Sequence, residues 1–99
     1  MPYEDFEFRF SAEKDIWLRA NRNMSFERII NEIGSGNLVL RSGTRNTSKY
    51  PNQNIFVVLI DEYCWTVPCV IDGNKIFFKT AFRDRKMDKK MSAIIRSQT

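Results

Sequence analysis

Three β runs near the middle of the chain constrain the fold more than any other feature. They cover residues 55–60, 63–71 and 75–82, and only short segments, 61–62 and 72–74, separate them. Asp-Glu and Asp-Gly-Asn connections of two and three residues are typical of β-hairpins, so we expect an antiparallel meander.

Pro68 lies inside the second of these runs. Because proline has no amide donor, it does not fit a regular interior strand. We therefore expect Pro68 at a sheet edge or at a bulge.

The first third of the chain predicts one strand and two helices. Residues 3–10 alternate, with phenylalanines 6, 8 and 10 on one face and charged residues 5, 7 and 9 on the other, which is the period of a half-buried strand. Ser11 is a suitable N-cap for a helix that ends near Asn21, and we expect Ile16 and Trp17 to face the sheet.

A second helix is predicted from Ser25 to Gly34 or Gly36, because residues 26, 29, 30 and 33 form an apolar stripe. A short strand at 38–40 follows, and a basic amphipathic helix begins at Arg85. The predicted fold class is therefore α+β: one domain over residues 1–99, with the order β-α-α-β-β-β-β-α and a single antiparallel sheet.

The composition excludes several kinds of chemistry. The chain has no histidine and only two cysteines, so neither a structural zinc site nor a histidine-activated nucleophile is expected. Cys64 and Cys69 are five residues apart in a strand, which sends their side chains to opposite faces and disfavours a disulfide. The carboxylates are scattered, and we expect no metal ion and no cofactor.

Positive charge is concentrated in the last quarter of the chain. Residues 75–99 contain eight basic and two acidic side chains, whereas residues 1–33 contain five and seven. This excess favours a polyanionic partner, most plausibly nucleic acid, although a solvated lysine-rich helix explains the charge equally well. The acidic N-terminus does not resemble a secretory signal, and no apolar run reaches membrane-spanning length, so we expect a cytoplasmic protein.

The junction between the last strand and the last helix is a candidate phosphate site. Arg83 and Arg85 lie at the expected start of this helix, where free backbone N–H groups also favour anions. The alternative is that both arginines merely pair with Asp84, with Asp88 or with the acidic first strand.

Metal-free RNA cleavage is a chemistry that these residue types could support. It needs cations around the scissile phosphate and groups that move protons, and it does not require histidine. We expect Arg83 and Arg85 to hold the phosphate, and Lys79 or Lys49 to transfer protons. Side chains expected to contact the RNA are Lys86, Lys89, Lys90, Lys14, Arg19 and, by stacking, Tyr50.

Three stretches of the chain resemble the BrnT family of type II toxins. Residues 6–30 are similar to the family's opening aromatic strand, acid-Lys helix and Ser-Phe-Glu helix. Residues 79–91 resemble its closing basic run, and residues 49–80 resemble a branch that has a Tyr-Pro-Asn-Gln loop and a Val-Pro strand. Together the stretches cover nearly the whole chain.

The resemblance implies a RelE-like ribonuclease fold and RNA cleavage that blocks translation, on or off the ribosome. It also implies a BrnA-like antitoxin that has a ribbon-helix-helix domain and forms a hetero-oligomer with the toxin. The matching motif residues are Arg85, Lys86, Lys79, Glu13 and Lys14. The sequence departs from the pattern at Arg22, where many members have histidine, and at Met87 and Met91 in the last helix.

Two other readings of the basic tail stay open. The first is a non-catalytic module that binds RNA or the ribosome. The second is that the apolar stripe of the last helix docks an antitoxin or a second subunit.

Overall fold

A computed structural model describes residues 6–43 and 53–97 of the chain. The elements in chain order are β1 (Glu7–Phe10), α1 (Ala12–Arg22), α2 (Phe26–Gly34), β2 (Leu38–Gly43), β3 (Gln53–Ile60), β4 (Tyr63–Asp72), β5 (Lys75–Phe78), β6 (Phe82–Arg83) and α3 (Arg85–Ser97). The α+β class and the predicted order of elements are confirmed, with the last predicted strand divided into β5 and β6.

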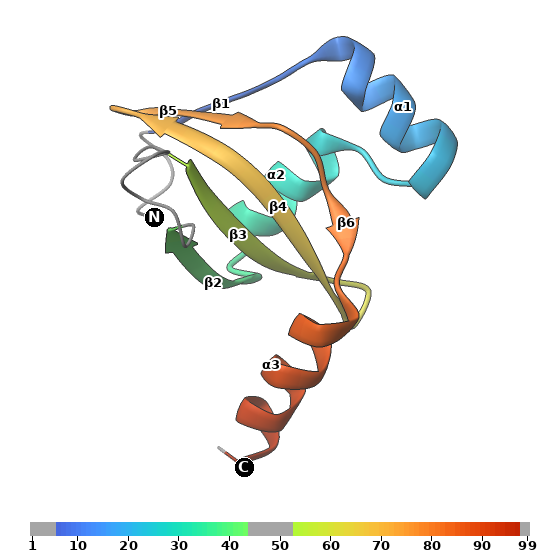
Figure 1. Cartoon of the computed structure of the whole chain (residues 1–99), viewed down its shortest axis with the longest axis vertical. Helices are drawn as coiled ribbons and strands as arrows, with labels where there is room; N and C mark the ends of the chain where they lie inside the picture. Colours follow the sequence, from blue (N-terminus) through green and yellow to red (C-terminus); the bar gives the residue numbers. More distant parts are fainter. Residues whose placement is uncertain (1–5, 44–52, 98–99) are drawn as a thin grey trace.

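The described strands form one mixed sheet in the order β1-β5-β4-β3-β2, and β6 pairs with β4 (Figure 1). The hairpins β3–β4 and β4–β5 are antiparallel, as predicted. The expectation of a purely antiparallel sheet is wrong, because β1 runs parallel to β5. The two helices after β1 carry the chain across one face to the opposite edge, so β1 and β5 are not joined by a hairpin.

Pro68 explains why the predicted strand 75–82 is interrupted. It lies in β4, an interior strand, and not at a sheet edge. Between the pairs Thr66–Phe82 and Cys69–Phe78, two residues of β4 face the three residues 79–81, so Pro68 lies at a bulge, the other predicted alternative. The Pro68 carbonyl accepts the Lys79 N–H at 2.9 Å. In an antiparallel pair the backbone nitrogen and oxygen of one residue point toward the same neighbouring strand. The missing donor of Pro68 therefore faces residues 79–81, which belong to no strand.

Serine caps begin both N-terminal helices, as predicted. Ser11 Oγ accepts the Lys14 N–H at 3.3 Å, and Ser25 Oγ accepts the Arg28 N–H at 3.2 Å. These bonds satisfy donors that have no partner within the helix. The two caps thus set where α1 and α2 start.

The expectation that Ile16 and Trp17 of α1 face the sheet is wrong. Ile16 is 67% exposed and Trp17 is 39% exposed, whereas Leu18 and Asp15 are buried. The Trp17 ring is covered by cations instead of by the sheet, because Lys14 Nζ and the Arg22 guanidinium lie 4.1 and 4.5 Å from its centre. The helix therefore contacts the core through a narrow stripe.

The main core lies between the sheet and the α1–α2 layer. Phe78 is fully buried in it, with ring centres 5.5 Å from Phe8, 5.9 Å from Phe26 and 6.2 Å from Phe56. Three further side chains, Val67, Cys69 and Ile76, are buried in the same cluster. This packing makes the α1–α2 side the main source of hydrophobic stabilisation.

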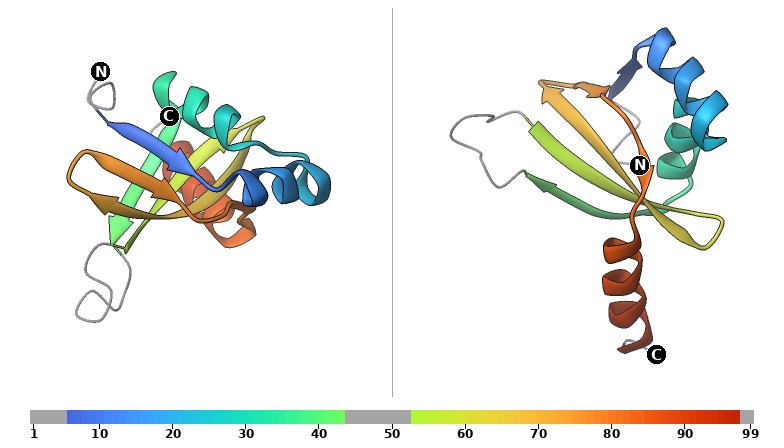
Figure 2. Two further views of the ribbon diagram at one scale, coloured as in Figure 1. Left: turned by 90° about the horizontal axis from the view of Figure 1, so that it is seen from above. Right: turned by 45° about the vertical axis from the view of Figure 1, so that its right-hand side comes forward.

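A smaller cluster lies on the opposite face of the sheet, where Met91 of α3 packs with Val57 and Cys64. Cys64 and Cys69 therefore face opposite sides and are both free thiols, as predicted. Only the start of α3 lies against the sheet, and the rest of this helix extends away from the strands (Figures 1 and 2). Within the described residues, no helix has the length and apolar character to cross a membrane.

Candidate functional site

Four arginines gather where the end of α1, the start of α2, the β3–β4 turn and β6 meet. One cavity of about 650 Å³ is lined by Arg19, Ala20, Asn21, Arg22, Asn23, Trp65, Phe82 and Arg83. An adjoining cavity of about 320 Å³ shares four of these residues and adds Met24, Arg28, Ile60, Asp61 and Tyr63. We call the two cavities together the arginine cleft.

The end of α1 places two of the arginines. Asn23 ends the helix in the left-handed conformation, at φ 50°, and its N–H is bonded to the Leu18 carbonyl. Arg19 and Arg22 occupy the last turn, where the helix dipole favours positive charge. The cleft therefore begins at a helix end that stabilises cations.

Asp15 holds the corner between α1 and α2. Its Oδ1 accepts the Phe26 N–H at 2.9 Å, and its Oδ2 pairs with Arg19 Nε at 3.0 Å. Because Asp15 is buried, these bonds offset the desolvation of its charge. Its carboxylate therefore holds the first residue of α2 and the guanidinium of Arg19 in place.

Arg22 ties α1 to the break between β5 and β6. It donates to the Ala81 carbonyl at 2.6 Å and, more weakly, to Thr80 Oγ1 at 3.4 Å. Its guanidinium also packs on Trp17. Arg22 is thus an anchor as well as a lining residue of the cleft.

Arg83 has the freest guanidinium of the four. Its backbone pairs with Trp65, and its guanidinium carbon lies 4.1 Å from the centre of the Tyr63 ring. No ion pair joins it to a carboxylate among the described residues, whereas Arg28 pairs with Asp61 at 2.8 Å. Its donors are therefore available to an incoming anion.

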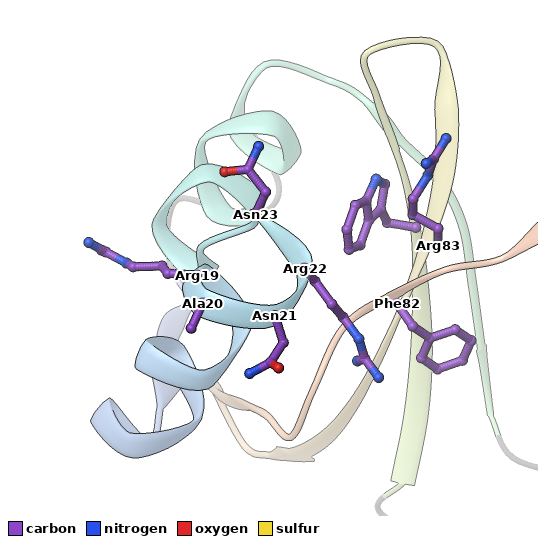
Figure 3. A pocket seen from close by; sticks show the side chains of 8 residues that line it. Arg19, Ala20, Asn21, Arg22, Asn23, Phe82 and Arg83 are labelled. Carbon is purple, nitrogen blue, oxygen red and sulfur yellow. The ribbon is translucent and has the colours of Figure 1, made fainter.

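The arginines do not surround a single point. Figure 3 shows Arg19 extending away from the other two labelled arginines, while the guanidinium groups of Arg22 and Arg83 point in opposite directions. A spread of this kind fits successive phosphates of a nucleic-acid backbone better than it fits one isolated anion.

The structure brings only part of the predicted site together. Arg83 and Arg19 line the arginine cleft, but Lys79, Arg85 and Lys14 do not. Lys49 and Tyr50 lie outside the described residues. The side chains of Lys86, Lys89 and Lys90 are exposed on α3.

The predicted phosphate site at the start of α3 is filled by the chain's own carboxylates. Asp84 Oδ1 accepts the Met87 N–H at 3.1 Å, and Asp84 Oδ2 accepts the Thr66 hydroxyl at 2.8 Å. Asp88 Oδ1 accepts the Cys64 N–H at 3.2 Å. These carboxylates therefore cap α3 and fasten it to β4 instead of pairing with Arg83 or Arg85.

Sequence reasoning missed Arg28, Asp61, Tyr63 and Trp65 as site residues and treated Arg22 only as a departure from a family pattern. Arg22 and Arg28 flank the α1–α2 corner, which the two helix signals had located. Tyr63 and Trp65 lie in the predicted meander. No local signal shows that these segments share a cleft, since their approach depends on how α1 and α2 cross the sheet.

The thiols are unsuited to nucleophilic chemistry. Burial raises the pKa of Cys69 to about 12, and burial together with nearby Asp88 raises the pKa of Cys64. Both thiols therefore stay neutral near pH 7. Across residues 6–43 and 53–97, no three side chains of the metal-binding types lie close enough together to hold a metal ion.

No family model matches the chain, and no curated protein or solved structure matches it either. A functional proposal therefore rests on the residues and geometry of the arginine cleft, together with the resemblance carried by the sequence motifs.

Proposed function

We propose that this chain is a cytoplasmic toxin of a toxin–antitoxin pair, with a RelE-like form of the α+β fold, and that it cleaves RNA at the arginine cleft without a metal ion. The observation that carries the proposal is the unpaired guanidinium of Arg83, which stands over Tyr63 in a cavity that also contains Asp61. A cation and two proton-exchanging groups thus share one cavity.

Each group has a role in transesterification. Arg83 binds two oxygens of the scissile phosphate and stabilises the charge that develops on them. Asp61 accepts the proton of the 2′-hydroxyl, whose oxygen then bonds to phosphorus. The bond from phosphorus to the 5′-oxygen breaks, and Tyr63 donates a proton to that oxygen. The products are a 2′,3′-cyclic phosphate and a 5′-hydroxyl.

The remaining cations bind the rest of the RNA in this proposal. Arg22 lines the cleft beside Asn23 and meets a phosphate next to the scissile one, whereas Arg28 pairs with Asp61 and holds that carboxylate at the cleft. Lys14 and the lysines of α3 contact the backbone farther away. The proposal moves proton transfer from Lys79 and Lys49 to groups inside the cleft, and it moves Arg85 to the outer contacts.

A second candidate is a module that binds RNA or the ribosome without cleaving it. The divergence of Arg22 and Arg83 in Figure 3 favours this reading, because catalysis of this kind gains most when cations converge on one phosphate. Both candidates use the same cleft, and both predict binding that weakens with salt.

Product analysis separates the two candidates. Purified protein is incubated in EDTA with a single-stranded RNA, and the new ends are identified. We expect cyclic phosphate ends, and we expect Arg83→Ala to slow cleavage by roughly 100-fold. Arg9→Ala is the matched control. Arg9 is an exposed arginine on the edge strand β1, pairs with Glu7 of the same strand and does not line the cleft.

Three outcomes would change the proposal. Cleavage that stops in EDTA contradicts the metal-free mechanism. RNA that stays intact while binding depends on Arg83 supports the non-catalytic module. Equal activity of the Arg83 and Arg9 variants would remove the cleft from the site.

The partner belongs to the same proposal. The resemblance implies a BrnA-like antitoxin with a ribbon-helix-helix domain. Co-expression with the neighbouring reading frame should relieve growth inhibition and yield a hetero-oligomer. Toxicity that this frame does not relieve argues against the pairing.

A further inference from the structure

The sheet face that points away from α1 and α2 carries exposed apolar side chains with charges around them. Side chains alternate along the strands, so Val70 and Phe77 point away from the main core. Phe77 is 43% exposed, although its neighbour Phe78 is fully buried. We call the outward side of β5, β4 and β1 at this point the open face; its residues are Phe77, Val70, Glu7, Arg9, Asp72 and Lys75.

The charges nearest the β4–β5 hairpin alternate in sign across the sheet. The strand register places Glu7 of β1, Lys75 of β5 and Asp72 of β4 side by side in one row. All three side chains are exposed. Lys75 and Asp72 form no ion pair within the described part of the chain. Both are therefore available to groups outside this chain.

The mixture of signs limits what can cover the open face. An RNA strand or an acidic segment would meet the carboxylates of Glu7 and Asp72. A basic segment would meet Arg9, Lys75 and the exposed Lys79. The charges therefore fit a partner whose own charges alternate in the same spacing, and the same row on a second copy of this chain has that property.

A two-fold axis that runs along the strands, midway between β4 and β5, makes two open faces complementary. It exchanges β4 of one copy with β5 of the other, so Lys75 faces Asp72 of the second copy, and symmetry forms this contact twice. In the next row Phe77 faces Val70 of the second copy. Opposite charges and apolar side chains are thus each brought together.

We infer that the open face is a contact between two copies of this chain related by this axis. Face-to-face packing of two sheets is a common layer arrangement. The helix α3 does not lie across the contact, because it packs on Val57 and Cys64 and then extends away from the strands (Figures 1 and 2). The patch holds far fewer side chains than the roughly 20–30 of a standard interface, so the dimer is weak and forms at high concentration.

The inference is independent of the proposed function. The arginine cleft uses Trp65 and Arg83, which pair with each other and belong to the core side of the sheet, where Trp65 lies in the main cluster. The dimer contact uses the other side. The two proposals therefore fail separately.

Sedimentation equilibrium of the full chain over a range of concentrations tests the contact. We expect the mass to rise from that of one copy toward that of two. Phe77→Ser should raise the dimer Kd about 10-fold. Ile16→Ser is the matched control, because it removes an exposed apolar side chain from α1 and should leave the Kd unchanged. Circular dichroism checks that each variant is folded.

A charge exchange tests the pairing of Lys75 with Asp72. Lys75→Asp alone brings carboxylates together at both contacts, and Asp72→Lys alone brings ammonium groups together. Each variant should therefore raise the Kd roughly 10-fold. An equimolar mixture of the two variants restores opposite charges at both contacts, so it should form a mixed dimer with nearly the original Kd.

Three results would overturn the inference. The first is a chain that stays monomeric at its highest soluble concentration. The second is a mixture of the two charge variants that associates no more tightly than either variant alone. The third is an equal effect of Phe77→Ser and Ile16→Ser, because the contact would then not involve the open face.

Discussion

The two faces of the sheet differ in how they use their charged side chains. On the α1–α2 face, Asp15, Arg19 and Arg22 are bonded to neighbouring backbone or side chains, and Arg83 stays unpaired. On the α3 face the carboxylates are bonded to the backbone and to Thr66, and several cations stay unpaired.

The difference shows that a count of charges does not locate a site. The last quarter of the chain holds the excess positive charge, yet Arg83 is the only cation among residues 75–97 that lines the cleft. The other cleft arginines come from α1 and α2, in the part of the chain with a net negative charge. Three of the four cleft arginines therefore come from a region of net negative charge, and the basic helix α3 lies outside the cleft.

The largest expected effect compares two adjacent phenylalanines. Phe78→Ala removes a ring from the centre of the main core and should lower the free energy of unfolding by roughly 3–5 kcal/mol. Phe77→Ala changes a side chain that is 43% exposed on the other face of the sheet, and it should cost much less, about 1 kcal/mol. Urea unfolding measures both, and equal losses would contradict the placement of Phe78 in the core and of Phe77 on the opposite, more exposed face.

Asp15 should show the next largest effect. Asp15→Ala leaves the Phe26 N–H without its acceptor and should cost about 2 kcal/mol. Glu13→Ala is the matched control, because Glu13 is an exposed acid in the same helical turn and should change stability by about 0.5 kcal/mol or less. A loss at Glu13 as large as that at Asp15 would rule out the proposed role of Asp15 at the corner.

Asp84 tests the attachment of α3. Asp84→Ala removes the helix cap and the bond from Thr66, and should cost about 1–2 kcal/mol with partial loss of helical circular dichroism. Asp84→Asn keeps an acceptor oxygen and should lose less. If neither change alters the helix signal, α3 is held by its apolar contacts alone.

The smallest expected effect is a pH dependence from Cys69. Its native pKa is about 12, above its ordinary value of 9.0, so between these values the unfolded chain binds fewer protons than the folded one. Stability therefore falls as the pH rises, by about 1 kcal/mol between neutral pH and about pH 9.5. Thermal unfolding across this range should show the slope, and Cys69→Ala should reduce it. A slope that is unchanged in this variant would assign the dependence to other groups.

Local signals were sufficient for much of the fold. The serines at 11 and 25 cap helices because capping needs only a hydroxyl and the next turn of backbone. The Asp-Gly-Asn segment makes a hairpin for an equally local reason. The parallel pairing of β1 with β5 could not be predicted in this way, because it depends on where two helices return the chain.

The site was less predictable, because it too depends on contacts between segments that are distant in the sequence. Arg83 was found because it stands beside a strand–helix junction, but its neighbour Tyr63 lies twenty residues earlier and reaches it only through the β4–β6 register. Trp17 was expected on the inward face of the first helix. Two cations cover its ring instead, and the sequence alone does not show that contact.

The most direct test of the central claim compares one arginine inside the cleft with one outside it. RNA cleavage in EDTA is measured for Arg83→Ala and Arg85→Ala, with folding checked by circular dichroism. The arginine cleft predicts a loss of roughly 100-fold for Arg83→Ala and little change, within about 3-fold, for Arg85→Ala. A large loss at Arg85 with full activity at Arg83 would contradict the cleft and return the site to the start of α3.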